Sequence, residues 1–181
     1  MKKTGLFIIV MLQVLLIQAQ FSKANLQATG LTCALCSNAI NKALKQLPFV
    51  ESVKADIKNS SFSIVFRQGV EVEPDAVKDA VEGAGFFVGG LQVTGSFQHL
   101  NTGPDGIIKI GANWFRFLKV PNQVLNGEVT FTLQEKSFLT AKEFKKISSS
   151  VKIPSLSTGK AEADQDKAGV KKGERIYHVT I

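Results

Sequence analysis

The sequence predicts an α+β protein: a ferredoxin-like first segment, residues 24–93, followed by a β-rich second segment, residues 95–181. In the first segment the apolar residues switch between a period of two and a period near 3.6, which gives the order strand, helix, strand, strand, helix, strand. The second segment has β-branched and aromatic runs between Gly, Pro and Asn turns. The 181 residues are 44% hydrophobic and 20% charged, which suits an ordinary globular core.

Six elements follow one another in the first segment. A short strand over residues 24–29 leads to a helix over 36–47, which Pro48 ends. Two alternating strands, 50–57 and 61–66, flank a turn at 58–60. Pro74 opens a second helix that glycines end, and a last strand covers 86–93. Each helix has one apolar stripe, so both are expected on one face of a four-stranded antiparallel sheet.

The second segment predicts strands within 106–120 and 127–134, and a closing strand over 175–181. Residues 140–150 read as a short helix, with Thr140 as N-cap and Glu143 as its capping-box partner. The polar run 157–174 is expected to be a long exposed loop. These elements suggest a small barrel of the oligonucleotide/oligosaccharide-binding type. An immunoglobulin-like sandwich is the alternative, but one helix and few strands count against it.

Residues 1–19 have the features of a secretory signal peptide. Lys2 and Lys3 precede an apolar run over 6–17, and small Ala19 precedes Gln20. The run is shorter than the roughly 20 residues that a membrane span needs, so an uncleaved anchor is the weaker alternative. We expect cleavage after Ala19, an exported protein that is periplasmic or secreted, and membrane contact only through this segment.

Charge and motif content argue against two classes of function, nucleic-acid binding and enzymatic catalysis. The net charge is +7, and its excess lies mainly in the second segment. The cations are scattered rather than clustered with aromatic residues, so no nucleic-acid partner is expected. The chain has two histidines and neither a G-x-S-x-G nor an H-E-x-x-H motif, so we expect no enzyme. We expect a monomer in the absence of metal.

Both cysteines, Cys33 and Cys36, lie within "GLTCALC". A disulfide across this spacing would restrain very little chain, so a structural staple explains it poorly. Two thiolates at the start of a helix suit a soft ion. His99 and His178 are distant in sequence, so a two-coordinate ion is favoured: Cu(I) first, then Hg(II). Zn(II) or Cd(II) would need further ligands from water or a partner.

The motif "GLTCALC" resembles the G-M-T-C-x-x-C motif of heavy-metal-associated domains, which occur in copper chaperones, metal-transporting P-type ATPases and the periplasmic mercury-binding protein. The resemblance covers about residues 24–93 and includes "VEGAGFFV", residues 81–88. It implies that Cys33 and Cys36 bind the metal and that Phe86 packs near the site. Thr32 matches the motif threonine, a helix-entry position, and Leu31 replaces the family's methionine.

These observations predict an exported protein that holds a soft ion through a surface dithiolate and exchanges it with a donor or acceptor protein. Leu31, Leu35 and Phe86 would shield the sulfurs or simply pack in the core. A thiol–disulfide redox module is the main alternative, although no Trp precedes Cys33 and the intervening pair is Ala-Leu. A third hypothesis is an interaction protein whose basic second segment binds an acidic partner.

Overall fold

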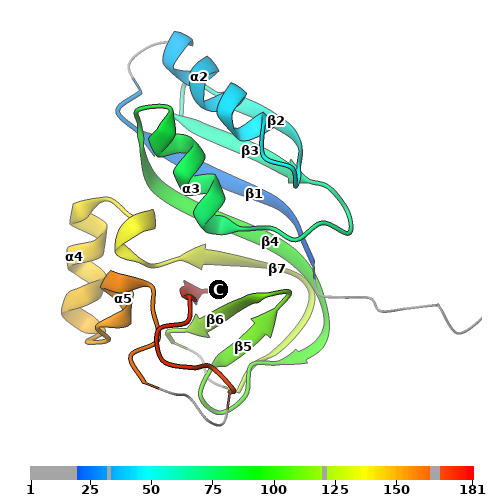
Figure 1. The fold of residues 1–181 in the computed structure, drawn as a ribbon, viewed down its shortest axis with the longest axis vertical. Helices are drawn as coiled ribbons and strands as arrows, with labels where there is room; N and C mark the ends of the chain where they lie inside the picture. The colour runs from blue at the N-terminus through cyan, green and yellow to red at the C-terminus, as the bar shows by residue number, and fades with distance from the viewer. Residues whose placement is uncertain (1–19, 32–33, 120–121, 164–167) are drawn as a thin grey trace, which may run out of the picture.

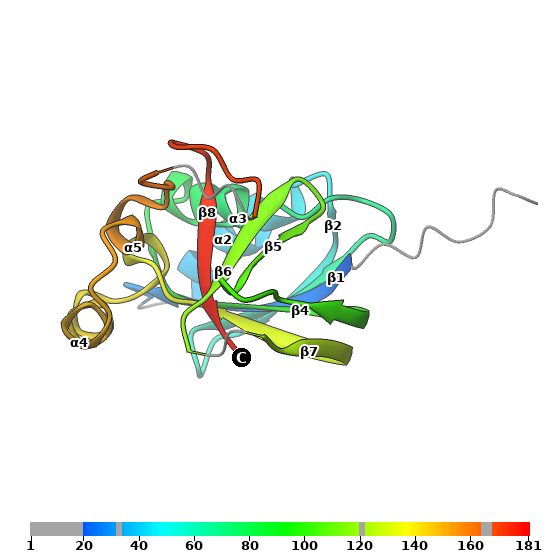
Figure 2. The ribbon, with the colours of Figure 1, turned by 90° about the horizontal axis from the view of Figure 1, so that it is seen from below.

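The computed structural model describes residues 20–31, 34–119, 122–163 and 168–181. The first half has the predicted order: β1 (Gln20–Thr29), α2 (Ala34–Lys45), β2 (Val50–Asp56), β3 (Ser61–Phe66), α3 (Pro74–Gly83) and β4 (Phe87–Asn101). The strands pair antiparallel in the order β2-β3-β1-β4. Both helices cover one face of this sheet (Figures 1 and 2). The ferredoxin-like prediction is therefore confirmed for the first half.

The second half extends the same sheet. It contains β5 (Ile107–Ile110), β6 (Asn113–Phe117), β7 (Val124–Leu133), the 3₁₀ turn η1 (Lys136–Phe138), α4 (Ala141–Ser150), α5 (Ser155–Thr158) and β8 (Ile176–Thr180). Strand β7 pairs antiparallel with β4 and with β8, and β8 pairs parallel with β6. The strand order is β2-β3-β1-β4-β7-β8-β6-β5. Across the described residues the sheet is open, with β2 and β5 at its ends, so the structure does not show the expected barrel.

The length of β4 explains this difference. The strand was expected over 86–93, but it continues to Asn101. One side pairs with β1 and the other with β7, from Gln92 opposite Thr132 to Asn101 opposite Val124. The predicted boundary between the two segments, residues 93–95, therefore lies inside this strand. Because β4 offers β7 a free edge, the second half adds to the first sheet instead of closing on itself.

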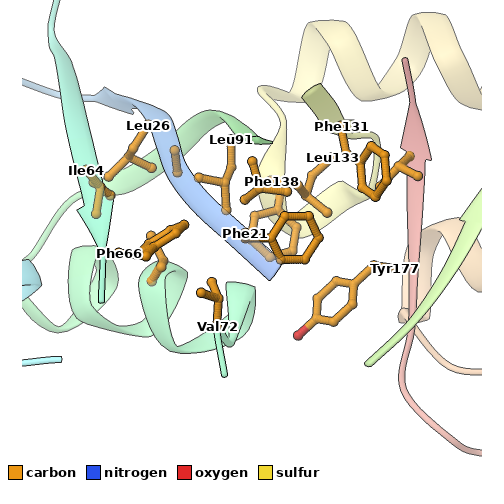
Figure 3. Close-up of a cluster of buried hydrophobic side chains, with 14 of the residues drawn as sticks. Phe21, Leu26, Ile64, Phe66, Val72, Leu91, Phe131, Leu133, Phe138 and Tyr177 are labelled. Carbon is orange, nitrogen blue, oxygen red and sulfur yellow. The ribbon is translucent and has the colours of Figure 1, made fainter. Parts of the chain in front are cut away.

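Aromatic side chains join the two halves in one hydrophobic core. Phe131 of β7 lies at its centre, with its ring centroid 5.3 Å from that of Phe97, 5.1 Å from Phe117 and 5.7 Å from Phe21. Figure 3 shows Phe21 of β1 beside Phe131 and Tyr177, while Leu26 and Ile64 continue the cluster into the first half. The sheet bends so that β6 and β8 cross β4 and β7 steeply (Figure 2), which brings these rings together.

The segment before β8 is more ordered than expected. The capping box of α4 is present as predicted: the Glu143 amide donates to Thr140 Oγ1 (3.3 Å), and the Thr140 amide donates to Glu143 Oε2 (3.1 Å). The range 157–174 was expected to be exposed, yet Ala161 and Val170 are buried in a small second cluster. Its described residues therefore pack on the sheet through their few apolar side chains.

Candidate functional site

The predicted cysteine motif lies where β1 leads into α2. Strand β1 ends at Thr29, and Gly30 follows with a φ of +84°. Cys33 lies outside the described residues, so the structure places only Cys36 of the predicted pair. Helix α2 begins at Ala34, two residues before the predicted start, which puts Cys36 in its first turn. Cys36 is half-buried, and its neighbour Leu35 is 81% exposed.

The apolar stripe of α2 orients Cys36. Ile40 and Leu44 follow it at four-residue spacing, and both are fully buried, so Cys36 continues their stripe to the end of the helix. The first backbone N–H groups of a helix have no partner within it, and its dipole favours negative charge there. This end of α2 therefore suits a thiolate that is partly accessible.

Phe86 is positioned by the end of α3. The Phe86 amide donates to Val81 O (3.2 Å) and the Gly85 amide donates to Glu82 O (2.9 Å), which is the Schellman pattern. Gly85 adopts the required positive φ, +88°. A Cβ on Gly30 would lie 3.9 Å from Phe86 Cδ1, so the ring lies against the start of the motif loop.

Of the three predicted apolar neighbours, Leu31 and Phe86 are partly buried and pack against the main core. Leu35 alone faces solvent. The packing interpretation therefore holds for Leu31 and Phe86, and Leu35 is the one available for contact with another protein.

The histidines lie elsewhere. His99 is exposed at an irregular point of β4, and His178 of β8 is fully buried against Ser155 and Glu135. Within the described ranges, no group of three or more His, Cys, Asp or Glu side chains is arranged to hold a metal ion. Among soft side chains, the dithiol motif remains the candidate donor set of this site.

A second polar cluster, which no sequence motif indicates, lies in the second half. Ser155 Oγ is 2.9 Å from His178 Nε2, and His178 Nδ1 is 3.3 Å from Glu135 Oε1. This order matches nucleophile, base and acid in hydrolases. All three residues are at most 1% exposed, however, and Glu135 also accepts from the His178 amide and from Arg175. We interpret the cluster as a structural network.

Arg175 connects this network to the first half. Its Nε and Nη2 donate to the two carboxylate oxygens of Asp75 in α3 (2.6 and 3.0 Å), and its Nη1 donates to Glu135 Oε1 (3.0 Å). Burial raises the pKa of Asp75, but the hydrogen bonds and charge of Arg175 outweigh it, so the net shift is downward. The guanidinium lies 3.9 Å from the centre of the Tyr177 ring. No sequence signal links partners 100 positions apart.

Comparison with known proteins identifies a domain within the first half, at residues 26–87. Residues 26–87 match the family described as "Heavy-metal-associated domain". A probable copper-transporting ATPase of Arabidopsis thaliana is 32% identical over 65 residues, which cover 36% of this chain and 6% of the ATPase. Residues 26–87 therefore form a heavy-metal-associated domain, as the motif predicted.

Solved structures give two further likenesses. A CopZ metallochaperone is 28% identical over 37% of this chain and 98% of its own, with a TM-score of 0.35. The yeast copper transporter domain Ccc2a is 25% identical over 37% of this chain and 90% of its own, with a TM-score of 0.33. The family assignment rests on the sequence match. No helix in the described ranges has the length and apolar character to cross a membrane.

Proposed function

We propose that this chain is an exported protein that binds one soft metal ion, Cu(I) in the first place, through Cys33 and Cys36 and transfers it by ligand exchange. The observation that carries the proposal is the C-x-x-C motif at the junction of β1 and α2, with Cys36 in the first helical turn of a heavy-metal-associated domain. The copper-transporting ATPase that matches this region supports the choice of metal.

The donor set favours a two-coordinate ion. Thiolates are soft ligands that select Cu(I), and Hg(II) fits the same two sulfurs. Zn(II) and Cd(II) prefer four ligands and would need them from water or a partner. The proposal thus ranks Cu(I) and Hg(II) above Zn(II) and Cd(II).

Metal transfer requires a site that another protein can reach and a loop that the domain core holds in place. Half-buried Cys36 and exposed Leu35 lie at the surface, while Leu31 and Phe86 anchor the loop to the core. A donor or acceptor protein can therefore bring its own thiolates to the ion, form a three-coordinate intermediate and accept the ion without refolding the domain.

Export and the absence of enzymatic activity belong to the same proposal. The signal segment 1–19 lies outside the described residues. Phe21 is already a core residue, so a chain that begins at Gln20 keeps the described core complete. The buried Ser155–His178–Glu135 network supports a structural rather than a hydrolytic role.

A competition titration tests the site. The reduced protein is titrated with Cu(I) against a chelator of known affinity, beside Cys33→Ser, Cys36→Ser and the control Ser37→Ala, which alters the neighbouring buried hydroxyl. Each cysteine variant should lose tight binding and keep its circular dichroism spectrum, while Ser37→Ala binds like the parent. Tight Cu(I) binding by both cysteine variants would refute the assignment.

A further inference from the structure

A cleft of about 550 Å³ lies between the end of the heavy-metal-associated domain and helix α4. Thr29 and Phe87 line it from the domain, and Lys136 and Phe144 line it from the second half. We propose that this α4 cleft docks an acidic segment, bearing one apolar side chain, of the protein that exchanges metal with this chain. The proposal rests on the function proposed above and adds the chemistry of the partner.

The apolar part of the α4 cleft is incompletely covered. Phe87 is 68% exposed although it is a large aromatic residue in a strand. Helix α4 is amphipathic, yet none of its residues is buried, and Phe144 on its apolar side is only half-covered. Two neighbouring aromatic rings at one surface cleft are typical of a contact site. An aliphatic or aromatic side chain placed there would remove both rings from water.

The surroundings of the cleft are positively charged. Lys136 lines it, and α4 carries exposed Lys142 and Lys145 close to the lining residues Ala141 and Phe144, whereas its third lysine, Lys146, lines a separate pocket. In the described part of the chain none of Lys136, Lys142 and Lys145 forms an ion pair. Two carboxylates lie nearby: Glu82 in the lining, and Glu143, which is held by Thr140. Unpaired cations around an apolar cleft favour an acidic occupant, because complementary charge steers and orients association.

The cleft adjoins the cysteine motif along the chain. Thr29, which lines it, is followed directly by Gly30 and then by the loop that carries the motif. A Cβ at Gly89 would lie 2.7 Å from Thr29 Cγ2 and 3.7 Å from Thr140 Cγ2. The missing side chain therefore lets the N-cap of α4 approach the end of β1. A segment seated in the cleft would hold its protein beside the loop.

A peptide titration followed by NMR tests this surface. The probe is a short synthetic peptide of Asp and Glu around one central Phe, added to the reduced, metal-free, ¹⁵N-labelled chain, and the comparison peptide has Asn and Gln instead. We expect amide shifts centred on Phe87, Lys136 and Phe144. The double variant Lys142→Glu/Lys145→Glu should weaken binding about tenfold, since it removes two attractive surface charges and adds two repulsive ones.

Matched control variants distinguish binding at the α4 cleft from non-specific electrostatic or apolar attraction of the peptide to the rest of the surface. Lys54→Glu/Lys58→Glu makes the same charge change at exposed positions in β2 and the following turn. Val124→Ser removes an exposed apolar side chain elsewhere, as the control for Phe87→Ser. Both controls should bind the acidic peptide like the parent, whereas Phe87→Ser should bind it more weakly.

Several outcomes would overturn the proposal: no shifts at the cleft, equal binding of the neutral peptide, or equal loss in the Lys54/Lys58 control. Shifts of the same residues on concentrating the chain alone would show a second copy as the occupant and would also overturn it. The peptide titration uses metal-free protein, so it does not depend on Cu(I) binding. The variant Lys142→Glu/Lys145→Glu should bind Cu(I) like the parent. Loss of Cu(I) binding and loss of peptide binding at the α4 cleft are therefore distinguishable.

Discussion

Two glycines with positive φ, Gly30 and Gly85, bring Phe86 against the motif loop. At Gly85 the requirement is purely conformational, because a Cβ there would meet nothing within 4 Å. The left-handed region costs a residue with a side chain about 1–2 kcal/mol. The sequence signals this position through the run Gly83-Ala84-Gly85, although it does not tell which glycine ends the helix.

Substitution of these neighbouring glycines should therefore have opposite effects. Gly85→Ala should lower the free energy of unfolding by about 1–2 kcal/mol. Gly83→Ala lies within α3, where its Cβ also meets open space, and should raise it by as much as about 1 kcal/mol. Urea unfolding measures the free energy of unfolding of both variants. Equal changes in the two variants would show that Gly85 does not end the helix in solution.

The carboxylates at the start of α3 should titrate on opposite sides of their ordinary values. Burial raises the pKa of Glu73, while Arg175 overcomes burial and lowers that of Asp75. Because the folded-state pKa of Asp75 is depressed, its stabilisation is present above the ordinary value of 3.8 and is lost as the pH falls through the folded value. Carboxyl NMR titration measures both.

Replacement of Arg175 tests whether this residue causes the lowered pKa of Asp75. In Arg175→Met the burial of Asp75 remains and its ion partner is gone, so its pKa should rise above the ordinary value. Glu73 should stay raised, because burial is its main cause. An unchanged, low pKa for Asp75 in this variant would contradict the assigned ion pair.

Helix α4 begins where its capping motif predicted, directly after Thr140. Thr140 and Glu143 form the reciprocal capping bonds that their spacing indicates. The capping box is a local signal contained in four consecutive residues, 140–143, so distant contacts do not override it. By contrast, the extension of β4 to Asn101 depends on β7, which lies far along the chain, and no local pattern reveals it.

Loss of the cap should loosen α4. Thr140→Ala should cost about 1 kcal/mol. Amide hydrogen exchange should then quicken first at Glu143, whose N–H donates to Thr140 Oγ1, and next at Phe144, whose N–H donates to the Thr140 carbonyl oxygen in the same turn. Ser149→Ala changes an exposed hydroxyl later in the helix and should have almost no effect. Equal changes in the two variants would mean that the capping box contributes nothing in solution.

Across the whole molecule, the two segments that the sequence separates share one sheet and one core. Residue patterns revealed the first half because its elements obey a known order and carry a specific motif. They did not reveal that Phe21 of β1 contacts Phe115 and Phe131 of the second half. Those contacts arise from the bend of the sheet, and the position of Arg175 beside Asp75 has the same origin.

Deletion of the central ring should therefore destabilise both halves. Phe131→Ala should cost about 3–5 kcal/mol, because the ring is fully buried among four others. Phe87→Ala, at an exposed ring, should change little. Trp114 fluorescence reports the second half, and amide exchange in β3 reports the first. A shift of the Trp114 transition alone would show that the halves unfold independently.

The proposed function requires that Cys33 and Cys36 together hold one soft ion. Copper-edge X-ray absorption on the reduced chain loaded with one equivalent of Cu(I), with a count of free thiols before and after, measures this. We expect a two-coordinate ion with only sulfur neighbours and the loss of both thiols. Nitrogen or oxygen neighbours, or two thiols that stay reactive after loading, would contradict it.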